Sequence, residues 1–307
     1  QKQYPLILLM ALGHSLCLAL FAQTALSTWS ETFLKELLRW LARVSVVMMG
    51  YCLLQWAQLD PFTKNISLQE ITQGHRNLVV GTLGNQNHLG AYLALTLPLL
   101  WLQRGLRWKA LTGVNLLLLT YLLVVNHSVG GMLSALAVLL WWCWRQSPRR
   151  AFLVAGIACV GWLLYTCIPA LFDFNGRLQA WRVFLTMSGQ HPAIGFGVGA
   201  VRFLTQPLKE GPLVGWGHVH NEYLQVLVEQ GLIGLGLVAW VLVAVIGRVR
   251  RLPKTPLVTA LSGMGLAFLV NSLYNFPAHL WVLAGLGLVA YCGLYVVEPD
   301  GKPEHIV

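Results

Sequence analysis

Apolar runs alternate with short polar breaks along almost the whole chain, and this pattern predicts its elements. A helix that spans a bilayer needs about 20 mostly apolar residues, within a range of roughly 17 to 25. The runs, some of them shorter than this, predict nine membrane-spanning helices at 5–26, 44–59, 89–103, 110–125, 132–144, 152–171, 224–246, 257–276 and 280–297. We therefore predict an all-α, polytopic membrane protein with a single membrane domain over 1–307.

The segment 31–43, before the second span, has a different pattern. Its leucines recur on one face of a helix, and its charged residues Lys35, Glu36, Arg39 and Arg43 lie on the other. This pattern is typical of a helix that lies at the membrane surface rather than across it. We expect an interfacial helix here, with the second span beginning at residue 44.

The composition agrees with a membrane location. Hydrophobic residues make up 56% of the 307 residues and charged residues only 10%, whereas soluble domains carry about 25% charged residues. The net charge is +10, and the basic residues cluster between apolar runs as Arg104, Arg107 and Lys109; Arg145, Arg149 and Arg150; and Arg248, Arg250, Arg251 and Lys254. Such clusters are typical of cytoplasmic loops. The expected partner is therefore the lipid bilayer, and no nucleic acid.

With the basic clusters on the cytoplasmic side, the alternating spans place two long loops on the opposite face. These are residues 60–88 and a large loop, 172–222. The large loop is predicted to be partly helical, with a helix from about residue 175 to 188 and a glycine-rich turn after it. A loop of this length in a compact protein usually has a function. In a bacterium this face would be periplasmic.

The large loop ends in a polar cluster, His218–Glu222, which carries two histidines, an amide and a carboxylate. Polar groups are expensive near a bilayer and usually have a function there. Asn221 suits an N-cap and Glu222 suits the first turn of a helix, which is a structural explanation for both. A neutral histidine is suited to general-base catalysis, since its pKa lies near neutral pH. The His-x-His-x-Glu spacing also leaves a metal site open, although no second ligand cluster supports one.

Arginines on the outward face run against the usual charge bias of membrane proteins. Arg177, Arg182 and Arg202 lie in the large loop, and Arg76 lies in the other loop. A guanidinium binds phosphate through two parallel hydrogen bonds, so a diphosphate is a suitable ligand. Each arginine alone could equally pair with lipid head groups. Residues 81–90, which include Asn87, form a glycine-rich turn without the lysine of a nucleotide-binding P-loop.

Five stretches of the sequence resemble the O-antigen ligase superfamily and occur in its order. They are 81–90 (GTLGNQNHLG), 176–181 (GRLQAW), 191–199 (HPAIGFGVG), 218–234 (HVHNEYLQVLVEQGLIG) and 271–277 (NSLYNFP). That superfamily also contains O-antigen polymerases, protein O-oligosaccharyltransferases and proteins labelled as bicarbonate transporters. The resemblance covers roughly residues 75–297. Members usually have more spans before the first stretch, which implies that this chain lacks N-terminal spans.

The resemblance implies a glycosyltransferase of the lipid-carrier-dependent, GT-C-like type. Such enzymes transfer a glycan from undecaprenyl diphosphate to an acceptor hydroxyl on the periplasmic face of the bacterial inner membrane, without a metal or another cofactor. It also implies that His220 is the base near the acceptor and that Arg177 contacts the diphosphate. The predicted substrate-binding residues are Arg76, Asn87, Arg182, Arg202, His218, Asn221 and Glu222.

One departure from the family pattern concerns a phosphate contact. Members often have Ser-Arg-Gly where this chain has Ser128-Val129-Gly130. Two explanations stay open. Either another residue, such as His127, replaces that arginine, or the substrate differs.

The function that these observations predict is ligation of an O-antigen glycan to lipid A-core. A protein acceptor and glycan polymerisation are alternatives within the same chemistry. The alternative from another class is a transporter of a small anion such as bicarbonate, which would need polar or broken helices near the middle of the membrane. Pro98, Asn115 and Asn271 keep this alternative open, but the centres of the spans carry little charge.

Overall fold

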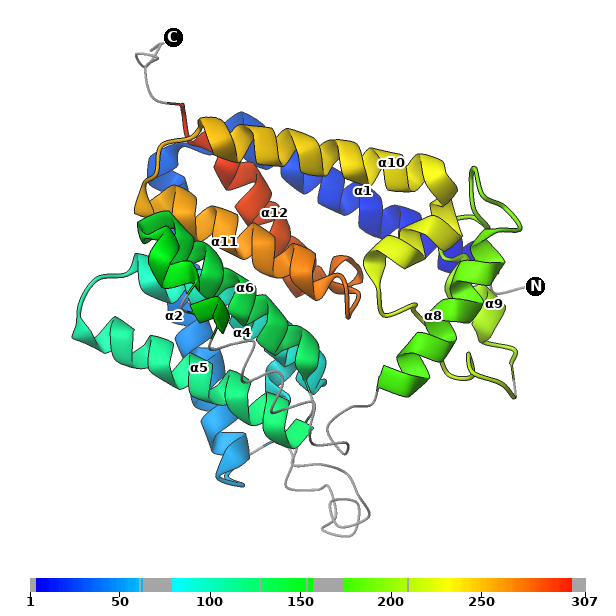
Figure 1. Ribbon diagram of the computed structural model, residues 1–307, viewed down its shortest axis with the longest axis horizontal. Coiled ribbons are helices and arrows are strands. Elements are labelled where there is room, and N and C mark those ends of the chain that lie inside the picture. Colours follow the sequence, from blue (N-terminus) through cyan, green and yellow to red (C-terminus); the bar gives the residue numbers. More distant parts are fainter. Residues whose placement is uncertain are drawn as a thin grey trace. The chain divides into compact units, whose positions relative to one another are not determined.

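A computed structural model describes residues 4–60, 62, 79–126, 128–152, 154–156, 174–208 and 210–299. Every regular element in these residues is a helix, as Figure 1 shows. Four of these helices are long and apolar enough to cross a membrane, namely Leu8–Thr28, Glu31–Trp56, Leu106–Val125 and Glu222–Arg251, and Pro256–Asn271 and Trp281–Val296 are shorter apolar helices. The prediction of an all-α, polytopic membrane protein is therefore confirmed.

Eight of the nine predicted spans coincide with a helix. These helices are α1 (Tyr4–Thr28), α2 (Glu31–Trp56), α4 (Gln86–Leu102), α5 (Leu106–Asn126), α6 (Val129–Gln146), α10 (Glu222–Arg251), α11 (Pro256–Asn271) and α12 (Trp281–Val296). The remaining span, 152–171, lies almost wholly outside the described residues, and so does most of the loop 60–88. The large loop contains α8 (Phe174–Ser188) and α9 (Ala200–Thr205), so it is partly helical as predicted.

The predicted boundary within α2 is wrong. The helix runs without a break from Glu31 to Trp56, so residues 31–43 form its first half and not a separate interfacial helix. Ser30 caps this helix, since its side chain accepts a hydrogen bond from the Phe33 N–H. The buried residues Leu34, Leu38, Ala42, Ser45, Met49 and Cys52 follow one stripe along the whole helix. Because the stripe continues past residue 43, the packing does not end the helix there.

The chain divides into two compact units. The first unit contains residues 1–29, 166–253 and 272–307, and the second unit contains residues 30–165 and 254–271. The histidine cluster therefore lies in the first unit, and the glycine-rich turn 81–90 lies in the second. A single membrane domain and missing N-terminal spans stay predictions.

In the first unit, α10 packs against α8, α9 and α12, and α1 packs against α9 and α12. The short 3₁₀ helix η3 (Pro277–His279) precedes α12 and is held from two sides. On one side, the Glu222 carboxylate accepts a hydrogen bond from the Ala278 N–H at 2.7 Å. On the other, His14 in α1 bonds the Ala278 carbonyl through Nε2 at 2.8 Å and packs its ring against Trp281.

In the second unit, α4 is the central helix, and all its residues from Leu89 to Leu100 are buried. It packs against α2, α5, α6 and α11. α4 and α6 run parallel to each other. Gly90 meets Gly131 near the starts of the two helices, and Trp101 meets Trp142 near their ends.

α11 runs antiparallel to α6. Asn271, at the end of α11, donates through Nδ2 to Ser134 Oγ near the start of α6 at 3.4 Å. Arg145, near the end of α6, donates through Nε to Thr259 Oγ1 in the first turn of α11 at 3.3 Å. The ends of α4 and α6 and the starts of α5 and α11 therefore share one end of the unit. The basic residues there are Arg104, Arg107, Lys109, Arg145, Arg149, Arg150 and Lys254.

The crossing of α4 and α6 depends on two glycines. A Cβ added at Gly131 would lie 2.7 Å from the Gly90 backbone, and one added at Gly90 would lie 2.6 Å from Ser128 Oγ. These distances are too short for a side chain, so the two backbones touch directly, as small residues allow between membrane helices. The stretch 128–131, which departs from the family pattern, therefore has a packing role.

We expect Gly131→Leu to destabilise the second unit, because a side chain has no space between these backbones. Overpacking of this kind costs about 1–3 kcal/mol, or more where the backbone must move. Gly113→Leu on α5 is the matched control, since a Cβ at Gly113 meets nothing within 4 Å. The thermal unfolding temperature in detergent should fall for Gly131→Leu alone. Equal unfolding temperatures for the two variants would contradict the close crossing.

Candidate functional site

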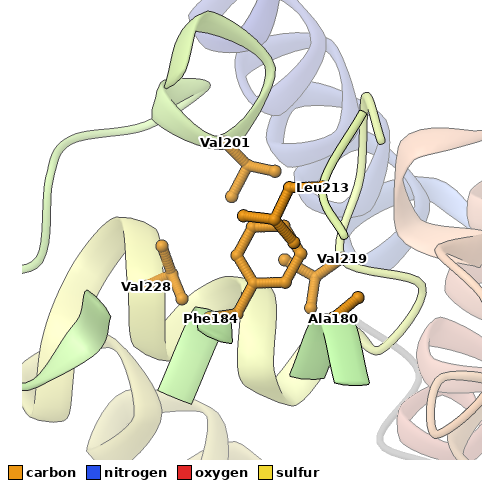
Figure 2. Close-up of a cluster of buried hydrophobic side chains, with 6 residues drawn as sticks. All are labelled: Ala180, Phe184, Val201, Leu213, Val219 and Val228. Atoms are coloured by element: carbon orange, nitrogen blue, oxygen red, sulfur yellow. The ribbon is translucent and has the colours of Figure 1, made fainter. Parts of the chain in front are cut away.

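A small hydrophobic cluster in the first unit supports the histidine segment. Its buried residues are Ala180, Phe184, Val201, Leu213, Val219 and Val228. Figure 2 shows the ring of Phe184 at the centre of the group, with the other side chains around it. The residues come from α8, α9, α10 and the segment between α9 and α10, so one core ties the large loop to the start of α10. Burial of each large apolar side chain contributes about 1.5–3 kcal/mol.

Val219, the residue between the two histidines, is anchored by its side chain and by both backbone groups. The side chain is fully buried in the cluster. The N–H donates to Gln225 Oε1 at 3.1 Å, and the carbonyl accepts from Trp181 Nε1 at 2.9 Å. The backbone of residues 218–220 is therefore held between α8 and α10, which limits where the histidine rings can lie.

Both histidine rings meet Phe276, which precedes η3. His218 stacks on it, with ring centroids 4.2 Å apart and an angle of 14° between the planes. His220 meets the same ring edge-on at 4.9 Å and also contacts Trp216 at 5.2 Å. The His220 backbone has φ 55°, a left-handed conformation that costs a residue with a side chain about 1–3 kcal/mol. The His220 imidazole is thus oriented by two aromatic rings on a strained backbone.

Glu222 joins the start of α10 to η3. It is buried, and Asn221 before it is the N-cap, as predicted, because Asn221 Oδ1 accepts from the Leu224 N–H at 3.0 Å. The Glu222 carboxylate accepts from the Ala278 N–H at 2.7 Å and lies 3.1 Å from His279 Nδ1. The carboxylate is therefore occupied in holding this turn.

Gln225, one turn along α10, contacts two histidines and Glu229. Its Oε1 accepts from the Val219 N–H, so Nε2 is the donor side of the amide. Nε2 lies 3.2 Å from His279 Nε2, 3.4 Å from His218 Nδ1 and 3.4 Å from Glu229 Oε1. An amide NH2 has two hydrogens, so it donates to two of these three acceptors. The shortest contact assigns the proton of neutral His279 to Nδ1, facing Glu222.

The two histidines near Gln225 titrate in opposite directions. Burial, together with the positive charges of His279, His220 and Arg202, lowers the pKa of His218 to about 3. Burial also disfavours the charged form of His279, but the hydrogen bond and the charge of Glu222 outweigh it and raise the pKa of His279. His218 is therefore neutral at pH 7 and adds no positive charge to the site.

The arginines of the large loop lie on different faces. Burial raises the pKa of the Tyr274 phenol, and the nearby charge of Arg177 acts against this, so Arg177 lies close to Tyr274. Arg202 is exposed on α9 and is near enough to His218 to affect its pKa. Arg182 is exposed and leaves α8 about 140° around the helix from Arg177. The structure therefore relates Arg202 to His218 and Arg177 to Tyr274, which precedes the Phe276 ring by two residues.

The described residues do not bring the other predicted contacts to this segment. Arg76 and His127 lie outside the described residues. Asn87 lies in the first turn of α4, in the second unit, where its N–H donates to the N-cap Asn85 at 2.8 Å. A role for Arg76 or Asn87 in substrate binding stays a prediction. In the described part of the chain, no group of three or more His, Cys, Asp and Glu side chains could hold a metal ion.

The first half of α10 ends at a break, and the loop 191–199 lies against it. Gly231 has φ 66° and ψ −161°, which is not helical. Four hydrogen bonds join the loop to the break: Phe196 N to Val228 O (2.9 Å), Gly197 N to Glu229 O (2.8 Å), Leu232 N to Pro192 O (2.8 Å) and Ile233 N to Ala193 O (3.2 Å). The loop thus bonds the backbone groups that would be left without partners where the helix is interrupted.

Two glycines allow this close approach. A Cβ added at Gly195 would lie 2.5 Å from the Glu229 carbonyl carbon, and one added at Gly231 would lie 2.4 Å from the Ala193 carbonyl. The HPAIGFGVG and EQGLIG stretches therefore form one structural unit, although they are separate in the sequence.

Glu229 connects the same region to α9. It is buried, and its carboxylate accepts from the Gly199 and Val201 N–H groups at 3.0 and 3.2 Å. Glu222, Gln225 and Glu229 recur at spacings of three and four residues, so they lie on one face of α10. This face contacts η3, the histidine segment and the start of α9.

Sequence reasoning missed part of this network. It assigned no role to Gln225, Glu229 or Trp216, and it did not relate Phe276 or His279 to the histidines. The helical spacing of Glu222, Gln225 and Glu229 in an apolar helix was a usable signal for a buried polar face. No local signal pairs Phe276 with His218, because the two are far apart in the chain.

Comparison with known proteins gives two matches. Residues 114–239 match the family model described as O-antigen ligase. The exopolysaccharide production protein ExoQ of Rhizobium meliloti (strain 1021) is 25% identical over 230 residues, which is 63% of this chain and 52% of that protein. The chain thus spans about half the length of this curated relative. The matched family segment includes α8, the histidine cluster and the break in α10, and the resemblance inferred from the sequence is confirmed.

We expect Gly231→Ala to destabilise the first unit strongly. The backbone angles at this position suit only glycine, and a Cβ would meet the Ala193 carbonyl, so the cost should exceed about 2 kcal/mol. Gly236→Ala in the same helix is the control, because a Cβ there meets nothing within 4 Å. Thermal unfolding and limited proteolysis within 191–199 are the measurements. An unchanged unfolding temperature for Gly231→Ala would mean that the loop does not hold the break as described.

The raised pKa of His279 should depend on Glu222. Replacing Glu222 with Gln removes the charge that opposes desolvation, so the pKa of His279 should fall in histidine-selective NMR titrations. Glu210→Gln, an exposed acidic residue of the same unit, is the control and should leave this pKa unchanged. Because the native pKa is raised, the pair stabilises the protein fully below the unfolded value of about 6.5, and this contribution is lost as pH rises through the native pKa. An equal His279 pKa in Glu222→Gln would contradict this assignment.

Proposed function

Because residues 114–239 match the family model described as O-antigen ligase, we propose that this chain is a membrane glycosyltransferase of polysaccharide biosynthesis. The donor is a glycan on undecaprenyl diphosphate, and the acceptor is a hydroxyl of lipid A-core. The reaction takes place on the periplasmic face of the bacterial inner membrane. The observation that carries the proposal is the His220 imidazole, which two aromatic rings orient on a strained backbone.

His220 acts as the base in this proposal. Its imidazole takes the proton of the acceptor hydroxyl while the hydroxyl oxygen attacks the anomeric carbon of the donor. The new C–O bond forms as the bond from this carbon to the diphosphate oxygen breaks, and the diphosphate leaves with the electron pair. This direct displacement inverts the configuration at the sugar. Base catalysis of this kind contributes about 10²–10⁴-fold.

Arg177 and Arg202 supply positive charge for the leaving diphosphate. Negative charge grows on the diphosphate as the glycosidic bond breaks, and guanidinium groups stabilise it by charge-assisted hydrogen bonds. The positions of Arg177 beside Tyr274 and of Arg202 near His218 support these roles. Arg76 and Asn87 are proposed as further contacts to the donor. Arg182 points to a different side of α8 from Arg177, and this orientation does not support the predicted role of Arg182 in substrate binding.

The remaining residues of the cluster act by position. Asn221 caps α10, and Glu222 holds η3, so both determine where Phe276 and His220 meet. His218 stays neutral and fills the space on the other side of Phe276. The chemistry proposed here needs neither a metal ion nor another cofactor.

A second candidate acceptor is a growing glycan chain, which would make the protein a polymerase. The name of the ExoQ relative, an exopolysaccharide production protein, favours this candidate. Neither comparison is to an anion transporter. Both enzyme candidates use the same site, since only the molecule that carries the hydroxyl differs.

His220→Ala should reduce transfer by about 10²–10⁴-fold, because the base is lost while the donor contacts stay. The measurement is transfer from purified undecaprenyl-diphosphate glycan to lipid A-core in vesicles, with lipid-linked glycan left unused. His191→Ala, an exposed histidine of the same unit, is the matched control and should transfer normally. Equal unfolding temperatures for the two variants would show that both are folded. Normal transfer by His220→Ala would remove His220 from the mechanism.

The same assay separates the acceptors. A protein and a second lipid-linked glycan are offered in place of lipid A-core. Product on the glycan alone would identify a polymerase, and product on the protein alone would identify a protein glycosyltransferase. Flux of bicarbonate into vesicles without any glycan product would overturn the enzyme proposal altogether.

A further inference from the structure

A cavity with two cationic residues in its lining lies at the basic end of the second unit, between α4, α6 and α11. Its volume is about 170 Å³, and its lining includes Trp101, Trp141, Trp142, Arg145, Lys254 and Thr259. A single water needs about 10–15 Å³ of such space, so the cavity can hold a group of several heavy atoms. The proposed transfer chemistry uses none of these residues.

Arg145 is held in this cavity by its neighbours. Its Nε donates to Thr259 Oγ1 at 3.3 Å, and its guanidinium lies over the ring of Trp141 at 5.5 Å. Trp141 is fixed in turn, because its Nε1 donates to Ser262 Oγ at 2.9 Å. A guanidinium oriented in this way loses little side-chain freedom when it binds an anion.

The charge around the cavity has one sign. Arg145 and Lys254 are the charged groups among the described lining residues, and the lining includes no Asp or Glu. An arginine in the last turn of α6 also suits the helix dipole, but that role requires neither a cavity nor a second cation. Tryptophans near the end of membrane helices are typical of the depth at which lipid head groups lie.

We propose that this cavity binds a phosphate group, carried by the head group of an anionic phospholipid in the leaflet on this side of the membrane. The Arg145 guanidinium and the Lys254 ammonium contact the phosphate oxygens. The three tryptophans pack beside the glycerol and the upper acyl chains. Basic pockets between membrane helices on the cytoplasmic side bind anionic head groups by this chemistry. Free inorganic phosphate presents the same kind of oxygen atoms as a lipid head group. The test must therefore separate lipid-borne phosphate from free phosphate.

The experiment measures phosphatidylglycerol retained by the full purified chain. The protein is incubated with mixed micelles of phosphatidylglycerol and phosphatidylcholine, and the lipid that stays bound is counted by native mass spectrometry. Arg145→Gln with Lys254→Gln should bind phosphatidylglycerol at least about tenfold more weakly, since charge-assisted hydrogen bonds are lost. The matched control is Arg107→Gln with Lys109→Gln, which removes the same charges from exposed positions at the same end of the unit.

Inorganic phosphate, in the absence of anionic lipid, forms the second arm. Thermal stabilisation by phosphate that the double variant loses, without retention of phosphatidylglycerol, would support the phosphate site but assign it to free phosphate. Equal binding of both probes by the double variant and the control would overturn the proposal, and so would no binding by wild type. Unfolding temperatures of the lipid-free proteins show whether each variant is folded. Because lipid retention is measured without glycan transfer, the outcome is independent of the proposed enzyme activity.

Discussion

The first unit depends on one constraint, which is that every backbone group freed by a broken membrane helix must find a partner inside the protein. The break at Gly231 interrupts a helix that is long and apolar enough to cross a bilayer. The loop 191–199 supplies two donors and two acceptors across this break. Since the loop can approach only where Gly195 and Gly231 lack side chains, the sequence of both stretches follows from this arrangement.

The break also explains how polar chemistry is placed at the end of an apolar helix. The short first half of α10 turns one polar face inward, and each group on it has a partner there. Glu222 holds η3, Gln225 holds Val219, and Glu229 holds the start of α9. Buried polar groups are stable only when they are satisfied in this way. The result is a rigid frame in which the histidine rings lie against Phe276, and rigidity of this kind is what a positioned base requires.

The second unit satisfies its polar groups and packs its helices in a different way. Its helices pack directly, through the glycine contact of α4 with α6, and their polar side chains pair across helices, as Trp141 does with Ser262. The basic residues Arg104, Arg107, Lys109, Arg145, Arg149, Arg150 and Lys254 lie at one end of this unit. The first unit thus holds a buried polar face, and the second has Arg145 and Lys254 in one cavity, where we propose that a lipid phosphate binds.

The sequence by itself determined the class of the protein and most of its helices, since a bilayer requires long apolar runs and helices that satisfy their own backbone. It also determined the cap at Asn221, which depends on neighbouring residues, and the resemblance to the O-antigen ligase family, which depends on short local motifs. It did not determine that residues 31–43 continue into the second span. The charged residues there suggested a separate helix, whereas the residues that pack against neighbouring helices follow one stripe along the whole of α2. Only the tertiary structure decided that Phe276 and His279 meet His218 and that Gln225 contacts both His218 and His279. These relations join segments distant in sequence, and such contacts follow from packing rather than from local pattern.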